Sequence, residues 1–210
     1  MRPLVKVCGM TRREDVDTCL ELGVNWLGFI FHPKSPRLVD SSFPAGLGRL
    51  PARKVGVFVD QSLEETQAIM ARGGLDMAQL HGGHVRHDEA FCKALGERKV
   101  VKVFWPERYW SLAALEAELE RYAPFCGHFL FDAGKGGGGH GRCLDFQALA
   151  RLKSPRPWFL AGGLSPDTLP EALALSPFGL DLNSGVEDAP GRKSRDKLKQ
   201  ALDLIDKATS

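Results

Sequence analysis

Short runs of β-branched and aromatic residues recur along the chain, and each is followed by a segment with helical periodicity. Eight strands in 210 residues leave about 26 residues per unit, enough for a strand, a helix and two loops. Strict alternation of this kind predicts a parallel sheet with helices covering its outside. The runs predict strands that begin near Val5, Trp26, Lys54, Met77, Val100, His128, Trp158 and Gly179.

Signals for helix starts lie between these strands. Thr11-x-x-Glu14 and Ser62-x-x-Glu65 match the capping box, in which a hydroxyl and a carboxylate satisfy two backbone N–H groups. Ser165-Pro166 predicts an N-cap with a proline in the first helical turn. The last segment predicts an amphipathic helix whose apolar stripe comprises Leu198, Ala201, Leu202 and Ile205.

Two closures of such a sheet compete, an open doubly wound sheet and an eight-stranded barrel. An open dinucleotide-binding sheet requires G-x-G-x-x-G after the first strand, and CGMTRRED at residues 8–15 lacks it. Eight units without a linker instead predict a single (β/α)8 TIM-barrel domain over residues 1–210. The run GKGGGGHG at 134–141 is interpreted as one flexible loop rather than a domain boundary.

Period-two alternation along the strands indicates which side chains share a face. The outer face of a barrel strand is covered by helices and should be apolar, so polar positions are expected to point into the barrel. Lys6, and as a further candidate Lys102, should lie slightly deeper on this inner face. Most of the inward positions fall at C-terminal strand ends, where barrel enzymes carry their active sites. The inward polar set comprises Cys8, Gln79, His81, Asp132, Asp181 and Asn183.

Composition contributes mainly by exclusion. A net charge of +2 without a block of like charges argues against a nucleic-acid partner. No apolar run approaches the roughly 20 residues of a membrane helix, and strand-like sequence from Leu4 onward argues against a signal peptide. Five cysteines at wide spacings, without a C-x-x-C pair, favour reduced thiols and a cytoplasmic location.

Individual polar residues also have plainer interpretations. A free cysteine such as Cys8 is most often a core residue, and an aspartate such as Asp132 often shapes a turn. The H-x-x-H-x-x-H spacing over 81–87 resembles a metal-ligand pattern, but its two glycines predict a loop, and we expect no metal. The convergence of six polar positions at one rim is what indicates a site. The cysteines interpreted as structural are Cys19, Cys92, Cys126 and Cys143.

Glycine-rich segments follow the last two strands. In AGGLSPDTL and NSGVEDAPG, Gly162, Gly163 and Gly185 allow backbone N–H groups to approach an anion closely, and Ser184 adds a hydroxyl. A short helix after Ser184-Gly185 would direct its positive end at the same point. Because barrels often bind phosphate with these two loops, the pair predicts a substrate that carries a phosphate monoester.

Together these segments resemble the phosphoribosylanthranilate isomerase family of tryptophan biosynthesis. The resemblance covers essentially the whole chain and rests on KVCGMTRRED, LGFIFHPKSPR, QLHG, FLFDA with GGHGRCLDF, AGGLSPDTL and DLNSGVEDAPGRK. It implies an Amadori rearrangement, in which an aminoaldose phosphate becomes a 1-amino-1-deoxyketose phosphate without a cofactor. The chain departs from the family pattern at His140, where G-G-T-G is common, and at CLDF, where F-D-W is common.

The resemblance also implies roles. It makes Cys8 the general base and Asp132 the general acid, and it implies that Arg37 holds the anthranilate carboxylate or the part of the substrate near it. Because Lys6 shares a face with Cys8, we expect Lys6 to lower the pKa of that thiol from its usual value. The remaining substrate-binding residues are Gln79, His81 and Asp181, and the phosphate-binding residues are Gly162, Gly163, Ser184 and Gly185.

Other functions are open from the residues alone. A barrel like indole-glycerol phosphate synthase would rely on a lysine as acid, and a Schiff-base lyase would use Lys6 or Lys102 as nucleophile. A non-catalytic phosphosugar-binding barrel would leave Cys8 merely packed. The expected partner is small-molecule phosphoribosyl anthranilate, with no membrane and no nucleic acid, and both a monomer and a homodimer fit the sequence.

Overall fold

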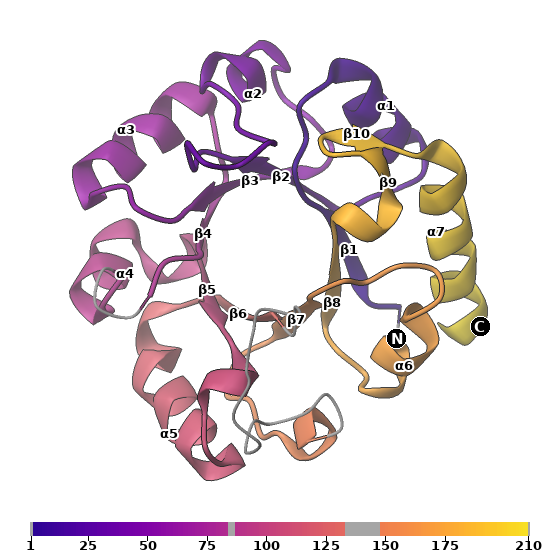
Figure 1. Cartoon of the computed structure of the whole chain (residues 1–210). Coiled ribbons are helices and arrows are strands. Elements are labelled where there is room, and N and C mark those ends of the chain that lie inside the picture. Colours follow the sequence, from indigo (N-terminus) through magenta and orange to yellow (C-terminus); the bar gives the residue numbers. More distant parts are fainter. Residues whose placement is uncertain (1, 84–86, 133–147, 210) are drawn as a thin grey trace.

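Eight parallel strands close into a barrel in the computed structural model, which describes residues 2–83, 87–132 and 148–209. The strands pair in sequence order, and β8 (Gly179–Leu182) returns to β1 (Leu4–Val7), with Leu4 opposite Gly179. Figure 1 shows the barrel along its axis, with the helices in a ring outside it. The other barrel strands are β2 (Trp26–Ile30), β3 (Arg53–Phe58), β4 (Met77–Leu80), β5 (Val100–Phe104), β6 (His128–Asp132) and β7 (Trp158–Ala161).

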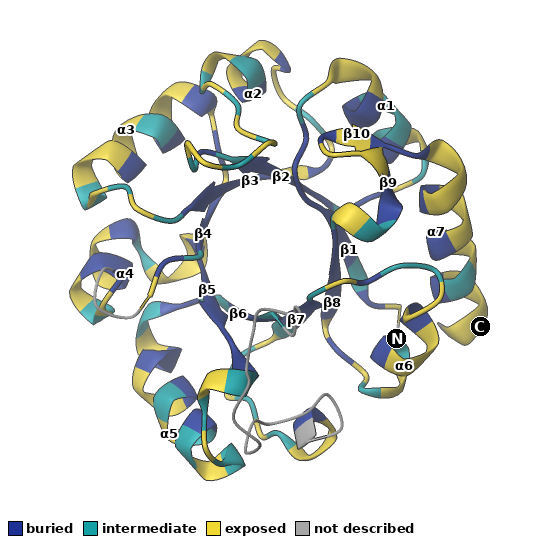
Figure 2. Cartoon of the chain, viewed as in Figure 1, coloured by how far each residue is buried: buried dark blue, intermediate teal, exposed yellow. Residues whose placement is uncertain are grey.

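Each of the eight expected strand starts lies within one residue of the observed start, so the strand prediction is confirmed. The barrel strands are buried almost throughout, whereas the helices are buried on the side that faces the barrel and exposed on the other (Figure 2). The α-helices are α1 (Arg13–Glu21), α2 (Ser42–Gly46), α3 (Leu63–Gly73), α4 (Glu89–Leu95), α5 (Leu112–Tyr122), α6 (Leu169–Ala174) and α7 (Arg195–Thr209). Short 3-10 turns are η1 (Glu97–Lys99), η2 (Pro106–Arg108), η3 (Ala123–Phe125), η4 (Ala148–Arg151) and η5 (Ser184–Val186). No helix in these ranges is long and apolar enough to cross a membrane.

Four local helix signals can be compared with the structure, and two of them are confirmed. The capping box at Ser62-x-x-Glu65 is present: the Glu65 N–H donates to the Ser62 hydroxyl at 3.1 Å, and the Ser62 N–H donates to the Glu65 carboxylate at 2.7 Å. The stripe on α7 is also confirmed, because Leu198, Ala201, Leu202 and Ile205 are all buried.

The other two helix starts were predicted wrongly. Helix α1 begins at Arg13, and Thr11 does not cap it, because its hydroxyl donates to the Gly191 carbonyl 2.5 Å away. Helix α6 begins at Leu169 rather than after Ser165, whose N–H donates to the Thr168 hydroxyl at 2.9 Å within a preceding turn. For Thr11, a competing hydrogen bond outside the helix takes the hydroxyl that the local pattern assigned to a cap.

Two apolar layers lie on either side of the strands. The outer layer packs against the helices, and the inner layer fills the interior of the barrel. Val101 and Val103 belong to the inner layer, so Lys102 between them faces the helices, and its expected inward position is wrong. Its Nζ donates to the His87 carbonyl at 2.8 Å and lies 4.9 Å from the centre of the Tyr122 ring. The inner layer consists of Trp26, Val55, Met77, Val101, Val103, Trp105, Leu130, Phe159 and Ala161.

Candidate active site

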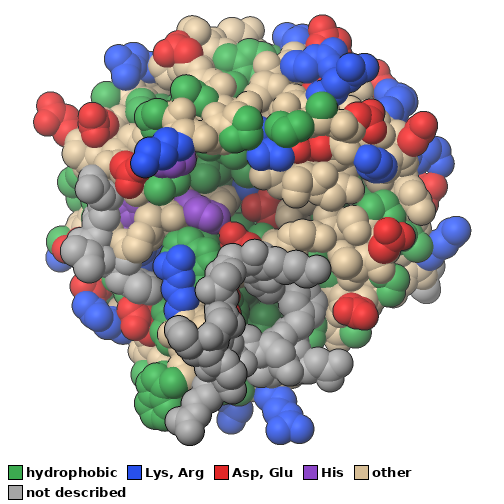
Figure 3. All heavy atoms as spheres, in the orientation of Figure 1, with side chains coloured by type: hydrophobic (Ala, Val, Ile, Leu, Met, Phe, Trp, Pro, Cys, Tyr) green, Lys and Arg blue, Asp and Glu red, His purple; other side chains and the backbone are tan. Residues whose placement is uncertain are grey.

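A cavity of about 330 Å³ opens at the C-terminal ends of the barrel strands. Figure 3 shows the hollow at the centre of this face, with histidine and acidic side chains gathered around it. Strand alternation brings together the polar side chains that the sequence placed on the inner face, while the apolar inner layer below them forms the floor. All six expected residues line the cavity: Cys8, Gln79, His81, Asp132, Asp181 and Asn183.

Lys6 and Asp181 form a buried ion pair at the base of this cavity. Lys6 Nζ lies 2.7 Å from Asp181 Oδ2, and the two side chains are 1% and 6% exposed. Paired strands β1 and β8 place these residues directly opposite each other, which explains the short distance. Burial alone would lower the pKa of Lys6, but Asp181, with a smaller contribution from Cys8, raises it overall. Lys6 is therefore a fixed cation.

The Cys8 thiol lies beside this cation. Burial is the largest influence and raises the pKa of Cys8, while Lys6 acts in the opposite direction by charge and hydrogen bonding. The expectation that Lys6 favours the thiolate therefore has the right sign, although burial outweighs it in the unliganded protein. A positively charged ligand beside this thiol would lower its pKa further and so favour the thiolate, which is the form that accepts a proton.

Asp132, at the end of β6, faces the same cavity from a strand that is not adjacent to β1. His81 Nε2 lies 3.6 Å from Asp132 Oδ2, and the His81 ring meets Trp105 edge-on at 5.2 Å. Burial is the main cause that lowers the pKa of His81, and it outweighs the opposing effect of Asp132. His81 is therefore a neutral imidazole at neutral pH.

Two buried side-chain oxygens in the cavity wall have no hydrogen-bond partner within the described residues. They are Gln79 Oε1 and Asp181 Oδ1. Buried acceptors are normally satisfied, because leaving one unpaired costs about 1–3 kcal/mol. Their position in a cavity wall indicates hydroxyl or amine donors on a ligand.

The loops after β7 and β8 form one end of the cavity. Gly162, Gly163 and Ser184 line it, and the two glycines have φ values of 103° and 67°. Gly185 lies behind them, where a Cβ atom would be only 2.0 Å from the Leu164 carbonyl oxygen. The expected helix after Ser184-Gly185 is only the single 3-10 turn η5, so the dipole available to an anion there is small.

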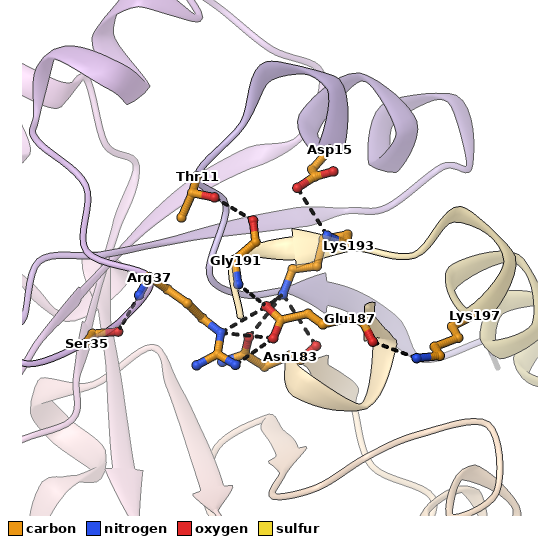
Figure 4. A network of polar contacts seen from close by, with 9 residues as sticks. All are labelled: Thr11, Asp15, Ser35, Arg37, Asn183, Glu187, Gly191, Lys193 and Lys197. Atoms are coloured by element: carbon orange, nitrogen blue, oxygen red, sulfur yellow. Dashed lines mark hydrogen bonds and ion pairs between the residues drawn. The ribbon is translucent and has the colours of Figure 1, made fainter. Parts of the chain in front are cut away.

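Arg37 does not line the cavity wall directly. It lies in the loop after β2, and its guanidinium pairs with Glu187 (Figure 4). Glu187 begins the hairpin strand β9 (Glu187–Ala189), which pairs with β10 (Arg192–Lys193). Burial alone would raise the pKa of Glu187, but hydrogen bonds from Arg37 and Lys193 lower it overall.

Several residues of the site were missed from the sequence. His32 and Ser35 line the cavity, and both lie in the quoted LGFIFHPKSPR segment, where the inward parity of Gly28 and Ile30 continues to His32. Glu187 and Lys193 were also missed, because they lie beyond the last barrel strand, where strand parity gives no signal. The remaining wall is formed by Ile30, Val57, Val59, Leu130, Ala161 and Leu164.

The histidines of the H-x-x-H-x-x-H spacing do not act together where they are described. His81 faces the cavity, whereas His87 is buried, and its Nδ1 accepts the Gly82 N–H at 3.2 Å. The buried thiols Cys19, Cys92 and Cys126 are free and lie in the outer apolar layer. His84, the glycine run with His140, and the CLDF segment with Cys143 lie outside the described residues.

Comparison with known proteins decides the family. A model of the N-(5'-phosphoribosyl)anthranilate isomerase family matches residues 5–203. The chain belongs to this family. It is 52% identical over 206 residues to the N-(5'-phosphoribosyl)anthranilate isomerase of Maridesulfovibrio salexigens, covering 98% of this chain and 99% of the relative. The corresponding isomerase of Desulfovibrio desulfuricans is 51% identical over 200 residues, with 95% and 93% covered.

Solved structures of phosphoribosylanthranilate isomerases share the barrel. The enzyme from Thermus thermophilus superposes with a TM-score of 0.78 at 36% identity, covering 97% of this chain and 98% of that one. The enzyme from Thermotoga maritima gives a TM-score of 0.81 at 29% identity, with 98% and 99% covered. These likenesses support the family's activity, an aldose–ketose isomerisation in tryptophan biosynthesis, and confirm the fold and function that the sequence motifs implied.

Proposed function

We propose that the cavity carries out this isomerisation by acid–base catalysis, with Cys8 as general base and Asp132 as general acid. The observation that supports it is the convergence of a thiol, a carboxylate and glycine-rich loops on one cavity of substrate size. A solved phosphoribosylanthranilate isomerase in complex with reduced 1-(o-carboxyphenylamino)-1-deoxyribulose 5-phosphate, 28% identical to this chain, indicates the ligand class.

The first step is ring opening. Asp132 donates a proton to the furanose oxygen as the C1'–O bond breaks, and the nitrogen lone pair forms the C1'=N bond of an iminium. The substrate nitrogen is therefore the electron sink of this reaction. The resulting carboxylate of Asp132 lies beside His81. Because His81 is neutral, it adds no positive charge that would hold Asp132 in the ionised form, so Asp132 can take up a proton again for the next turnover.

The second step removes the C2' proton. The iminium acidifies this proton, and its positive charge favours the thiolate of Cys8, which burial disfavours in the free protein. Cys8 takes the proton, the C1'=C2' bond forms, and the electron pair returns to nitrogen. The enol then becomes the ketone by tautomerisation, which completes a 1-amino-1-deoxyketose phosphate with no net change in oxidation state.

The remaining wall residues would orient the substrate. The unpaired oxygens of Gln79 and Asp181 suit the ribose hydroxyls as acceptors. Arg37 suits the anthranilate carboxylate, because a guanidinium matches a carboxylate in charge and geometry. The phosphate would bind the backbone N–H groups and hydroxyl of Gly162, Gly163, Ser184 and Gly185 at the end of the cavity.

The lysine-based alternatives fit the structure less well. Lys102 faces the helices, where its Nζ donates to a backbone carbonyl. Lys6 is at the base of the site, but its ion pair with Asp181 keeps it protonated, and a protonated amine cannot attack a carbonyl. We also propose a cytoplasmic location, which the free thiols of Cys8, Cys19, Cys92 and Cys126 support.

Two variants test the proposed acid and base. Cys8→Ala and Asp132→Asn should each lower kcat by about 10²- to 10⁴-fold, the range expected for a positioned acid or base. The loss of substrate fluorescence measures turnover, and growth of a tryptophan auxotroph that lacks the isomerase measures function in the cell. Cys19→Ala is the matched control, because it removes a buried thiol from α1 and should keep kcat. Near-normal turnover of either site variant would refute its role.

A further inference from the structure

We propose that Glu187 is a positioning residue, which holds the Arg37 guanidinium in the orientation that receives the substrate carboxylate. This inference rests on the proposed binding role of Arg37. The charge of Glu187 is in turn balanced by Lys193 (Figure 4). In this way the β9–β10 hairpin, which follows β8, holds the loop after β2 that carries Arg37.

Arg37 reaches the site from a loop without regular structure. Its side chain crosses the backbone where β1 ends, because a Cβ atom on Gly9 would lie only 2.5 Å from Arg37 Cδ. Gly9 follows Cys8 directly, and the charge of Cys8 acts on the pKa of Arg37, so the guanidinium lies near the proposed base. A long side chain from such a loop samples many rotamers unless something holds its end.

Glu187 fixes the end of this side chain by accepting hydrogen bonds from two nitrogens of the guanidinium, Nε and Nη2. Arg37 Nε lies 2.9 and 3.1 Å from the two carboxylate oxygens, and Nη2 lies 2.5 Å from Oε2. The side chains of Arg37 and Glu187 are only 16% and 4% exposed, so water screens the pair weakly. Within the described residues Nη1 donates no hydrogen bond, which leaves that edge of the fork for a ligand.

Glu187 is itself held from behind by the hairpin. Lys193 Nζ lies 2.7 Å from Glu187 Oε1 and 3.0 Å from Asn183 Oδ1, and the Gly191 N–H donates to Glu187 Oε1 at 3.2 Å. Lys193 also donates its backbone N–H to Asp15 on α1. Both oxygens of the carboxylate therefore accept hydrogen bonds, and a shift of Glu187 would break several contacts at once.

The charges of this group favour an anionic ligand. One carboxylate faces two cations, so Arg37, Glu187 and Lys193 together carry a charge of +1 when all are ionised. Hydrogen bonds from both cations lower the pKa of Glu187 despite its burial, so it is ionised at neutral pH. A substrate carboxylate at Arg37 would neutralise the group, whereas an unpaired Arg37 would fold onto other acceptors.

The test compares Glu187→Gln with Asp188→Asn, which removes an exposed carboxylate from the same hairpin. Glu187→Gln keeps the side-chain volume, removes the charge, and should raise KM about tenfold with little change in kcat, which corresponds to about 1.4 kcal/mol. Asp188→Asn should leave both constants unchanged. Glu187→Asp, which keeps the charge on a shorter side chain, should restore part of the affinity.

Calorimetric binding separates positioning from a general structural role. The probes are the reduced product analogue and its anilino counterpart, which lacks the carboxylate. Glu187→Gln should weaken the first about tenfold and leave the second unchanged, and it should add nothing in an Arg37→Met background. Equal weakening of both probes would overturn the inference. If Arg37→Met itself leaves the affinity of the carboxylate probe unchanged, the proposed role of Arg37 fails instead.

Discussion

Lys6→Met is expected to destabilise the protein strongly, because it leaves the Asp181 carboxylate buried without its partner. The two charges are 2.7 Å apart, so their attraction is about 6 kcal/mol at an effective dielectric constant of about 20. Desolvation of the two ions offsets much of this attraction in the intact pair. Once Lys6 is removed, only the desolvation cost of Asp181 remains, and the expected loss is about 3–5 kcal/mol of a total stability of about 5–15 kcal/mol.

Urea unfolding of Lys6→Met and of the double variant Lys6→Met/Asp181→Asn measures this effect. The double variant has no buried charge and should recover at least about 2 kcal/mol relative to the single variant. Equal destabilisation of the two variants would show that the loss comes from packing of the lysine stem, and the reasoning from charge would then be wrong.

The same substitution tests the link between Lys6 and Cys8. Lys6 acts to lower the pKa of the Cys8 thiol. Its removal should therefore move the part of the pH profile in which kcat/KM rises with pH to higher pH. The pH–rate profile is measured at a temperature where the single variant is folded, as judged by circular dichroism. An unchanged profile would refute the hypothesis that Lys6 tunes Cys8.

Two further predictions concern the bottom and the rim of the barrel. Burial, with smaller effects of Arg53 and Arg156, lowers the pKa of His128 to about 4. As pH falls, the unfolded chain therefore takes up a proton at this histidine before the folded protein does, which destabilises the fold. The free energy of unfolding should fall by about 1–2 kcal/mol between pH of about 6.5 and 4, a value that discounts the full shift because the ring is only half-buried. His128→Phe should reduce this slope in urea unfolding at pH 7 and pH 4.5, although His81 contributes to it as well, and a slope equal to that of the wild type would contradict the assignment. Gly185→Ala should raise KM and cost about 1–3 kcal/mol, because its Cβ would lie 2.0 Å from the Leu164 carbonyl oxygen. Steady-state kinetics with thermal unfolding check this, and a variant with wild-type KM would show that the loop contact does not shape the phosphate end.

Local signals failed where a tertiary contact competed with them. Thr11 carries the residue pattern of a helix cap, yet its hydroxyl bonds to Gly191, which is 180 residues away in the chain. Lys102 is a second case, because Val101 and Val103 on either side of it face the barrel interior, so the strand parity turns the lysine toward the helices. A buried lysine on the helix side is unusual, but a backbone carbonyl and an aromatic ring together stabilise its charge there.

By itself, the sequence determined the strands, their order and six of the polar side chains that face the cavity. Period-two alternation and recurrent turns are local properties, so Cys8, Asp132 and Asp181 could be assigned to one rim before any contact was known. Only the tertiary structure decided the Lys6–Asp181 pair and the hold of Glu187 on Arg37. These contacts join residues 175 and 150 positions apart, and they depend on barrel closure and on the path of two loops, which no local pattern encodes.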